Sequence, residues 1–123
     1  MATYVQIFLR PLRERSTQAV IDDVSRAAGT QLLDDPVHHE NSYVGMREDT
    51  AVELFVDHGF DDDDDMPFSS HPYMLRFRTL TRDVEHARAY MERSYTGLKN
   101  TGNYSMFSTY DLQDLLASDV VVQ

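Results

Sequence analysis

Hydrophobic and polar residues alternate along three stretches of the chain, in the pattern of β-strands that have one buried face. The three stretches are residues 3–10, 51–57 and 72–80. In the first stretch, Val5, Ile7 and Leu9 share one face, and Pro11 ends the alternation. The pattern therefore predicts three strands, each with one apolar face directed toward a common core.

Two helices are predicted from apolar residues that recur every three to four positions. The first covers residues 16–28, with the Ser16 side chain as its N-cap and Gly29 as its end. The second has Thr81 as its N-cap, and Gly97 is a candidate for its end. Its apolar stripe contains Val84, Ala87, Met91, Tyr95 and Leu98.

The remaining segments have less regular patterns. Residues 32–42 are predicted to form a loop, because an Asp-Pro step interrupts them. Residues 43–48 are predicted to pair with residues 51–57 through a turn at Asp49-Thr50, although Asp-Thr is not typical of two-residue turns. The C-terminal part is predicted to contain a strand or extended arm, a short helix and a final strand, at residues 104–109, 111–117 and 119–122.

The order of these elements predicts a single α+β domain over residues 1–123. We expect a ferredoxin-like antiparallel sheet with the two main helices on one face, plus a C-terminal helix and strand addition. The other face of the sheet would mix aromatic, apolar and charged side chains. Its predicted members are Tyr4, Gln6, Phe8, Glu53, Phe55, Asp57, Met74, Arg76 and Arg78.

The net charge of the chain is −10, from 21 acidic and 11 basic side chains among 123 residues. Such a charge repels nucleic acids and anionic membranes and favours a basic protein partner. Adaptation to high salt would produce the same acidity, so both explanations stay open. The chain contains no cysteine, which excludes disulfides, thiolate metal sites and a cysteine nucleophile.

Targeting signals and enzyme motifs are not visible in the sequence. It shows neither a secretory signal nor the apolar run of ~20 residues that a membrane span requires, so we expect a cytoplasmic protein without membrane contact. No nucleotide-binding, hydrolase or zinc-protease motif is present. The five histidines lack the spacing of metal ligands, so we expect neither a metal nor a cofactor. These observations favour a protein that is not an enzyme, and they are compatible with both a monomer and a dimer.

One segment, HGFDDDDDMPFSSH at residues 58–71, differs from ordinary globular sequence. Five adjacent carboxylates repel one another and favour a solvated loop, which is the simplest interpretation. The alternative is a surface for a basic partner, because aromatic residues beside the charges would supply affinity. The simpler interpretation of the tyrosines in the C-terminal part is a core or edge position. The alternative is that they extend this surface, since tyrosine is frequent in binding sites. The candidate partner-binding residues are Phe60, Asp61, Asp62, Asp63, Asp64, Asp65, Phe68, Tyr104 and Tyr110.

Two arginines share the outer face of the strand at residues 72–80. Arg76 and Arg78 would face Glu53 and Asp57 if their strand pairs with residues 51–57. The simpler interpretation is a cross-strand ladder of ion pairs. The alternative is an arginine pair that binds a carboxylate or phosphate ligand.

Two classes of function follow from these observations. The first is a small acidic interaction protein, most concretely an inhibitor or immunity protein that occludes a basic toxin or effector. The second is a small-molecule-binding or enzymatic domain, dimeric through its outer sheet face. In that class His38, His39, Tyr43 or Arg76 would transfer protons or bind an anion, but the sequence shows no base–nucleophile arrangement.

Overall fold

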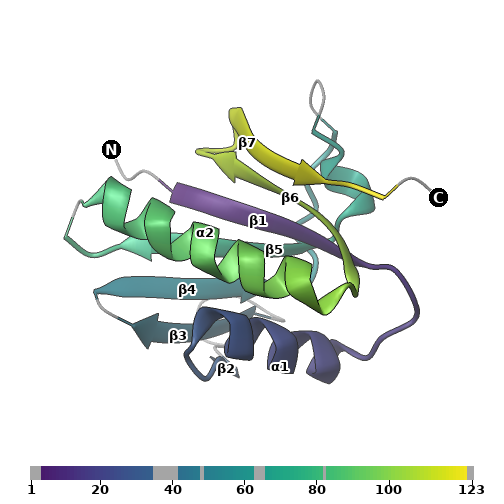
Figure 1. The fold of residues 1–123 in the computed structure, drawn as a ribbon, viewed down its shortest axis with the longest axis horizontal. Helices are drawn as coiled ribbons and strands as arrows, with labels where there is room; N and C mark the ends of the chain where they lie inside the picture. Colours follow the sequence, from purple (N-terminus) through teal and green to yellow (C-terminus); the bar gives the residue numbers. More distant parts are fainter. Residues whose placement is uncertain (1–3, 35–41, 48, 63–65, 82, 122–123) are drawn as a thin grey trace.

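The structure is a computed structural model that describes residues 4–34, 42–47, 49–62, 66–81 and 83–121. Within these ranges the chain forms a seven-stranded antiparallel sheet with two helices on one face (Figure 1). In chain order the elements are β1 (Tyr4–Pro11), α1 (Thr17–Ala28), β2 (Leu33–Asp34), β3 (Ser42–Arg47), β4 (Thr50–Phe55), the 3-10 helix η1 (Phe68–Ser70), β5 (Tyr73–Thr79), α2 (Val84–Thr101), β6 (Tyr104–Tyr110) and β7 (Asp114–Asp119). The strand order is β2-β3-β4-β5-β1-β6-β7.

This architecture confirms the α+β class, the antiparallel sheet and the two helices on one face. The described sheet has more strands than a simple ferredoxin-like fold, because β2 and β3 extend one edge and β7 extends the other. β1 lies in the interior, where Ile7 faces Leu75 of β5 and Ser108 of β6. Five consecutive residues of β1 are buried, so both faces of this strand are covered.

α1 begins and ends where the sequence predicts. The Ser16 hydroxyl accepts a hydrogen bond from the N–H of Ala19 at 3.1 Å, which satisfies a free donor of the first turn. Gly29 follows the helix with φ 69°, a left-handed conformation that glycine adopts without strain. The apolar side chains that α1 buries are Val20, Ile21, Val24 and Ala28.

α2 begins later than predicted. Its N-cap is Asp83 rather than Thr81, and the Asp83 carboxylate accepts from the N–H of His86 at 3.0 Å. A carboxylate at this position is favoured because it also interacts with the positive end of the helix dipole. The hydroxyl of Thr81 lies 3.2 Å from that of Thr79, so it belongs to the turn that precedes the cap.

Gly97 does not end α2, which continues to the left-handed Gly102. Gly97 instead faces α1, where an added Cβ would lie 3.3 Å from the Cβ of Ala27. Two small residues opposite each other allow the helix axes to approach closely. The Tyr90 hydroxyl of α2 also donates to the carbonyl of Ala28, so the two helices form one layer.

β3 and β4 form the predicted hairpin, with Arg47 opposite Thr50. The turn therefore lies one residue earlier than the predicted Asp49-Thr50 step. Asp49 has φ 61°, and aspartate is one of the few residues that tolerate this left-handed conformation. The two-residue strand β2 pairs with β3 inside a stretch that the sequence predicts as a loop.

The prediction for the chain after β6 is wrong. Residues 114–119 form β7 rather than part of a helix, and residues 120–121 form no strand. Asp111 and Leu112 have φ values of 53° and 60°, and two successive left-handed residues reverse the chain into a hairpin. Pairing with β6 then satisfies the backbone hydrogen bonds that a helix would have satisfied internally.

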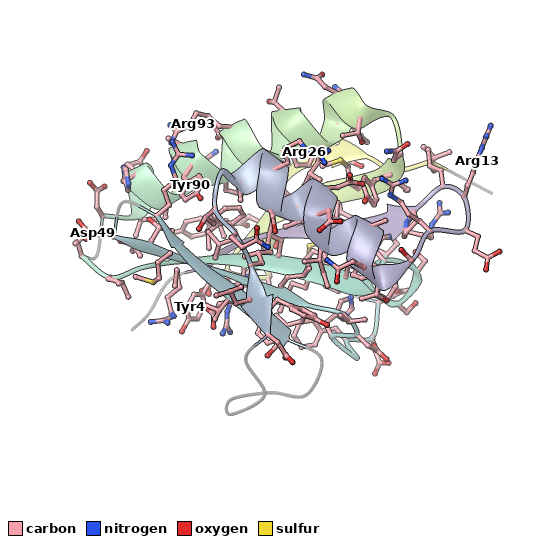
Figure 2. All side chains as sticks on the ribbon, turned by 90° about the horizontal axis from the view of Figure 1, so that it is seen from below. Tyr4, Arg13, Arg26, Asp49, Tyr90 and Arg93 are labelled. Atoms are coloured by element: carbon pink, nitrogen blue, oxygen red, sulfur yellow. The ribbon has the colours of Figure 1, made fainter. Side chains whose placement is uncertain are left out.

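The main core lies between the sheet and the helices, on the faces that the alternation predicts. The strands contribute Val5, Ile7, Leu9, Val52, Leu54, Tyr73, Leu75, Phe77 and Met106, and α2 contributes Ala87, Tyr90, Met91, Tyr95 and Leu98. In Figure 2, Tyr90 lies on the helix side of the sheet and Tyr4 on the opposite side. Full burial of each large apolar side chain stabilises the fold by about 1.5–3 kcal/mol relative to exposure.

A second apolar cluster lies on the outer face of the sheet. Its buried members are Phe8, Met66, Phe68, Met74 and Phe107. Phe8 and Met74 were predicted on this face, and they are buried because residues from the β4–β5 connection cover them. Gln6 is also buried, and its Oε1 accepts from the Thr109 hydroxyl at 2.6 Å. The outer face is therefore partly a core and only partly an open surface.

Candidate partner-binding segment

The acidic segment, residues 56–72, connects β4 to β5, and its residues Met66 and Phe68 pack on the outer face of the sheet. Phe68 of η1 is 4% exposed, and its ring lies 4.7 Å from that of Phe8 and 5.7 Å from that of Phe107. Phe8 and Phe107 stack at a centroid distance of 5.0 Å. Aromatic pairs at such distances add to the stabilisation from buried area. The segment is therefore anchored to the sheet through its own aromatic residue.

His58 holds the beginning of the acidic segment. Its Nδ1 accepts from the N–H of Phe60 at 2.8 Å, which leaves the ring proton on Nε2. Nε2 then donates to the carbonyl oxygen of His71 at 2.6 Å. The ring packs edge-on against Phe8 with centroids 5.1 Å apart and lies 4.9 Å from the ring of Phe60. These contacts fix the backbone and the ring of Phe60.

His71 holds the other end of the acidic segment and is 1% exposed. Its Nδ1 lies 3.1 Å from the carbonyl oxygen of Pro67 and 2.9 Å from the hydroxyl oxygen of Ser70. The carbonyl can only accept, and the Ser70 hydroxyl is placed to donate to that same carbonyl at 3.1 Å, so Nδ1 carries the proton. Its Nε2 therefore accepts from the Ser105 hydroxyl of β6 at 2.8 Å. The Ser105 oxygen accepts in turn from the N–H of Val121 at 2.8 Å. Burial lowers the pKa of His71, so this ring is neutral at neutral pH.

Asp62 is a surface carboxylate whose position is fixed by hydrogen bonds. Its Oδ1 accepts from the backbone N–H of Ser69 at 2.8 Å and from the Ser69 hydroxyl at 2.7 Å. These two bonds lower the pKa of Asp62, because they stabilise its charged form. Asp62 therefore presents an ordered negative charge at the surface.

The predicted site residues of the acidic segment separate into two layers. Phe60 is 37% exposed and, with the exposed Asp61 and Asp62, forms the surface layer. Phe68 lies in the buried layer below, where it anchors the segment rather than facing solvent. Residues 63–65, the three remaining aspartates Asp63, Asp64 and Asp65, lie outside the described residues.

The two tyrosines of the predicted surface belong to the opposite, helix-facing side of the sheet. Tyr104 is 6% exposed, and its hydroxyl donates to Oδ2 of the buried Asp23 at 2.6 Å. The same oxygen accepts from Nε of Arg15 at 2.9 Å and forms an ion pair with Nη2 at 2.7 Å. Burial and the bond to Asp23 raise the pKa of Tyr104. Tyr110 is half-buried and packs against the same core, so neither tyrosine joins the acidic surface.

Sequence reasoning did not find the side chains that hold the acidic segment in place. His58, His71, Ser69 and Ser105 provide most of its side-chain hydrogen bonds among the described residues. The available signal was the histidine at each end of the aspartate run, because a neutral imidazole both donates and accepts. Ser105 lies 34 positions beyond His71, and no local pattern indicates that contact.

Arg76 and Arg78 form the predicted cross-strand ladder with Glu53. Nε and Nη2 of Arg76 donate to the two oxygens of Glu53 at 3.1 Å each, and Nε of Arg78 donates at 3.4 Å. The Arg76 guanidinium also lies 4.7 Å from the ring of Tyr4 and 5.1 Å from that of Phe55. A bidentate pair held between two rings is a rigid arrangement. Arg76 is therefore already engaged by a carboxylate of its own chain.

A cleft of about 370 Å³ lies between the β1–α1 connection and the turn after α2. It is lined by Leu12, Arg13, Glu14, Arg15, Gly102 and Asn103. Arg13 points away from the body of the protein (Figure 2), and Arg15 is held by Asp23. These six lining residues include no nucleophile with an adjacent base.

Other functional classes also lack support in the part of the chain that the structure describes. No three His, Asp or Glu side chains of this part lie close enough together to hold a metal ion, and residues 35–41, with His38 and His39, lie outside it. Neither α1 nor α2 is long and apolar enough to cross a membrane. No protein-family model matches the chain, and no curated protein or solved structure is significantly similar to it.

Proposed function

We propose that this chain is a small acidic interaction domain, an inhibitor or immunity protein that binds and occludes a basic toxin or effector. The observation that carries the proposal is the surface of the acidic segment, where Phe60 is 37% exposed beside Asp61 and Asp62. A partly exposed aromatic residue supplies short-range affinity, and carboxylates accelerate the encounter with a basic partner. The net charge of −10 extends the same attraction over the whole molecule.

The anchoring of the acidic segment supports this proposal. A disordered loop loses conformational freedom when it binds, and that loss reduces affinity. Here Phe68 fixes the segment to the sheet, His58 fixes the backbone of Phe60, and Ser69 fixes Asp62. The side chains that would meet a partner are therefore positioned before binding.

We also propose that β1, α1, β4, β5, α2 and β6 form a ferredoxin-like core. The support is the strand order β4-β5-β1-β6, with one helix after β1 and the other after β5. β2, β3 and β7 are then additions at the two edges. In this arrangement the acidic segment replaces a short hairpin turn between β4 and β5, which places the binding surface away from both helices.

Capture of a partner from a lysate of the native host, followed by kinetics with the purified partner, tests the proposed function. We expect a basic protein that is retained at low salt and released at high salt, because salt screens the attraction between exposed charges. Phe60→Ala should increase the dissociation rate. Asp61→Asn with Asp62→Asn should decrease the association rate, while the amide oxygen introduced at the second position can still accept from Ser69.

The matched control removes the same number of charges from the helices. Asp22→Asn with Glu92→Gln changes two exposed carboxylates of α1 and α2. We expect association to slow less in this control than in the acidic-segment variant, because steering depends on charge close to the contact. Equal association rates for the two double variants would contradict the proposed surface. So would a partner whose binding changes neither with salt concentration nor with Phe60→Ala.

The second candidate function is a dimeric or small-molecule-binding domain that uses the open part of the outer sheet face. The observation in its favour is that Leu33 and Met46 are 63% and 55% exposed on this face. Sedimentation velocity and a ligand screen by thermal shift test this candidate, since a specific ligand raises the melting temperature. A monomer at all concentrations with no stabilising ligand would exclude it.

A further inference from the structure

We propose that His71 forms a pH-sensitive latch with Ser105, which holds the acidic segment on the sheet while the His71 ring is neutral and releases it when that ring is protonated. The latch would regulate the surface that carries the proposed function, and its relevance to binding rests on that proposal. The structural basis is independent of any partner, because all of the contacts lie within this chain.

The hydrogen bonds of His71 require the neutral ring. Its Nδ1–H faces the Pro67 carbonyl, so Nε2 must accept the Ser105 hydroxyl hydrogen. A second proton on Nε2 would remove that acceptor. Ser105 is fully buried, and its oxygen already accepts from the N–H of Val121, so its own hydrogen would lose its partner. A buried hydroxyl without a partner and a buried charge both destabilise the closed arrangement.

The charged groups around His71 do not offset this effect. Arg10 of β1 lies on the sheet side, and its guanidinium donates to the Val121 carbonyl at 2.6 Å. Burial is the largest influence on the pKa of His71 and lowers it; the hydrogen bond to the Pro67 carbonyl raises it, Arg10 and His58 lower it, and Asp62 raises it. The ring of Phe107 in β6 covers the same site edge-on at 5.2 Å. Protonation therefore places a charge in a buried site that is covered by an aromatic ring and lies near Arg10.

His58 couples the latch to the exposed aromatic residue. Its Nδ1 accepts from the N–H of Phe60, and its Nε2 donates to the carbonyl oxygen of His71. The ring lies among Phe8, Phe60 and Phe68, and His71 is the titratable neighbour to which it is hydrogen-bonded. Opening at His71 weakens the bond between His58 and the His71 carbonyl. The two ends of the acidic segment therefore separate together.

Release of the latch would change two parts of the surface. The segment would lift from Phe8 and Phe107, which would expose apolar rings that are now fully buried. Val121 would lose its bond to Ser105, so the chain after β7 would loosen with it. Phe60 and Asp62 would no longer be held in their present positions. A partner that recognises the ordered segment would consequently bind less tightly in acid.

Nitrogen-15 NMR of the isolated chain from about pH 8 to about pH 5 tests the latch. We expect the amide signals of Phe60, Ser69 and Val121 to change chemical shift with one common pH midpoint. That midpoint should coincide with the pKa of the His71 ring, which lies below its ordinary value. The amides of α1 serve as internal references. Titration of His71 without movement of the Phe60 and Val121 amides would overturn the proposal.

Ser105→Ala is the test variant, because it keeps both histidines and shortens one buried side chain. Loss of the Ser105 hydroxyl removes the donor that stabilises neutral His71, so the release midpoint should move to higher pH. An unchanged midpoint would also overturn the latch. Partner binding at about pH 8, where the segment is closed, tests the proposed function separately. A failed latch with intact binding, or the reverse, therefore identifies which of the two proposals is wrong.

Discussion

Replacement of Asp23 by alanine provides a direct test of the physical argument for the buried polar cluster. Asp23 is 5% exposed and receives four contacts, two from Arg15 at 2.9 and 2.7 Å, one from the Tyr104 hydroxyl at 2.6 Å and an ion pair from the exposed Arg26 at 3.6 Å. Removal of the carboxylate leaves the Tyr104 hydroxyl buried without this partner. The Arg15 side chain is 32% exposed, so its guanidinium can be solvated again and contributes little to the loss.

The magnitude follows from the Tyr104 hydroxyl. A buried polar group that loses its partner destabilises a protein by about 1–3 kcal/mol. With an unfolding entropy of about 2.1 cal/mol/K per residue, Asp23→Ala should lower the melting temperature by roughly 4–12 °C. The control is Asp22→Ala, one residue earlier on the exposed side of α1, which should change stability by less than about 0.5 kcal/mol.

Urea and thermal denaturation followed by circular dichroism measure both variants. A double-mutant cycle with Tyr104→Phe then isolates the pair, because the phenylalanine removes the hydroxyl that Asp23→Ala leaves unsatisfied. We expect the double variant to be less destabilised than the sum of the single variants by about 1–2 kcal/mol. Additive effects, or equal melting temperatures for Asp23→Ala and Asp22→Ala, would refute the reasoning.

Three further predictions concern the acidic segment and the helix contact. In urea titrations, Phe68→Ala should lower the free energy of unfolding by about 3–5 kcal/mol, and Phe60→Ala should lower it by less than about 1 kcal/mol. Equal losses of stability in the two variants would disprove the arrangement of a surface layer over a buried layer. Burial lowers the pKa of His71 below 6.5, so the unfolded chain takes up a proton at this ring at a higher pH than the folded chain does. The free energy of unfolding should therefore fall as pH decreases from 6.5 through the lowered pKa. A urea midpoint that rises in this range would contradict the neutral state assigned to His71. Gly97→Leu should destabilise by about 1–3 kcal/mol in thermal denaturation, because its side chain would meet Ala27, and a neutral effect would show that the helices can separate freely.

Local patterns were sufficient to predict most of the fold. The alternation of Val5, Ile7 and Leu9 predicted β1 and its core face, because the period of two is a property of the strand backbone itself. Ser16 predicted the start of α1 for a similarly local reason. The segment after β6 was mispredicted because Leu112, Leu115 and Leu116 have helical spacing, and pairing with β6 overrides that spacing.

The candidate site was only partly predictable, because its geometry depends on distant contacts. The aspartate run and the neighbouring Phe60 were visible in the sequence. That Phe68 turns inward depends on Phe107, a residue of β6, and composition gives no sign of this contact. Tyr104 was assigned to the surface because its partner Asp23 lies 81 positions away. A buried tyrosine and a surface tyrosine have the same local sequence pattern.

The interior position of β1 has a consequence for synthesis on the ribosome. β1 is the first strand of the chain, yet its two neighbours are β5 and β6, which begin at Tyr73 and Tyr104. At translation rates of about 5–20 residues per second, β1 waits roughly 3–12 s for β5 to be made and longer for β6. During this time its apolar residues have no sheet to join. The sheet around β1 therefore closes late, and the apolar residues of β1 stay open to aggregation until β6 has been translated.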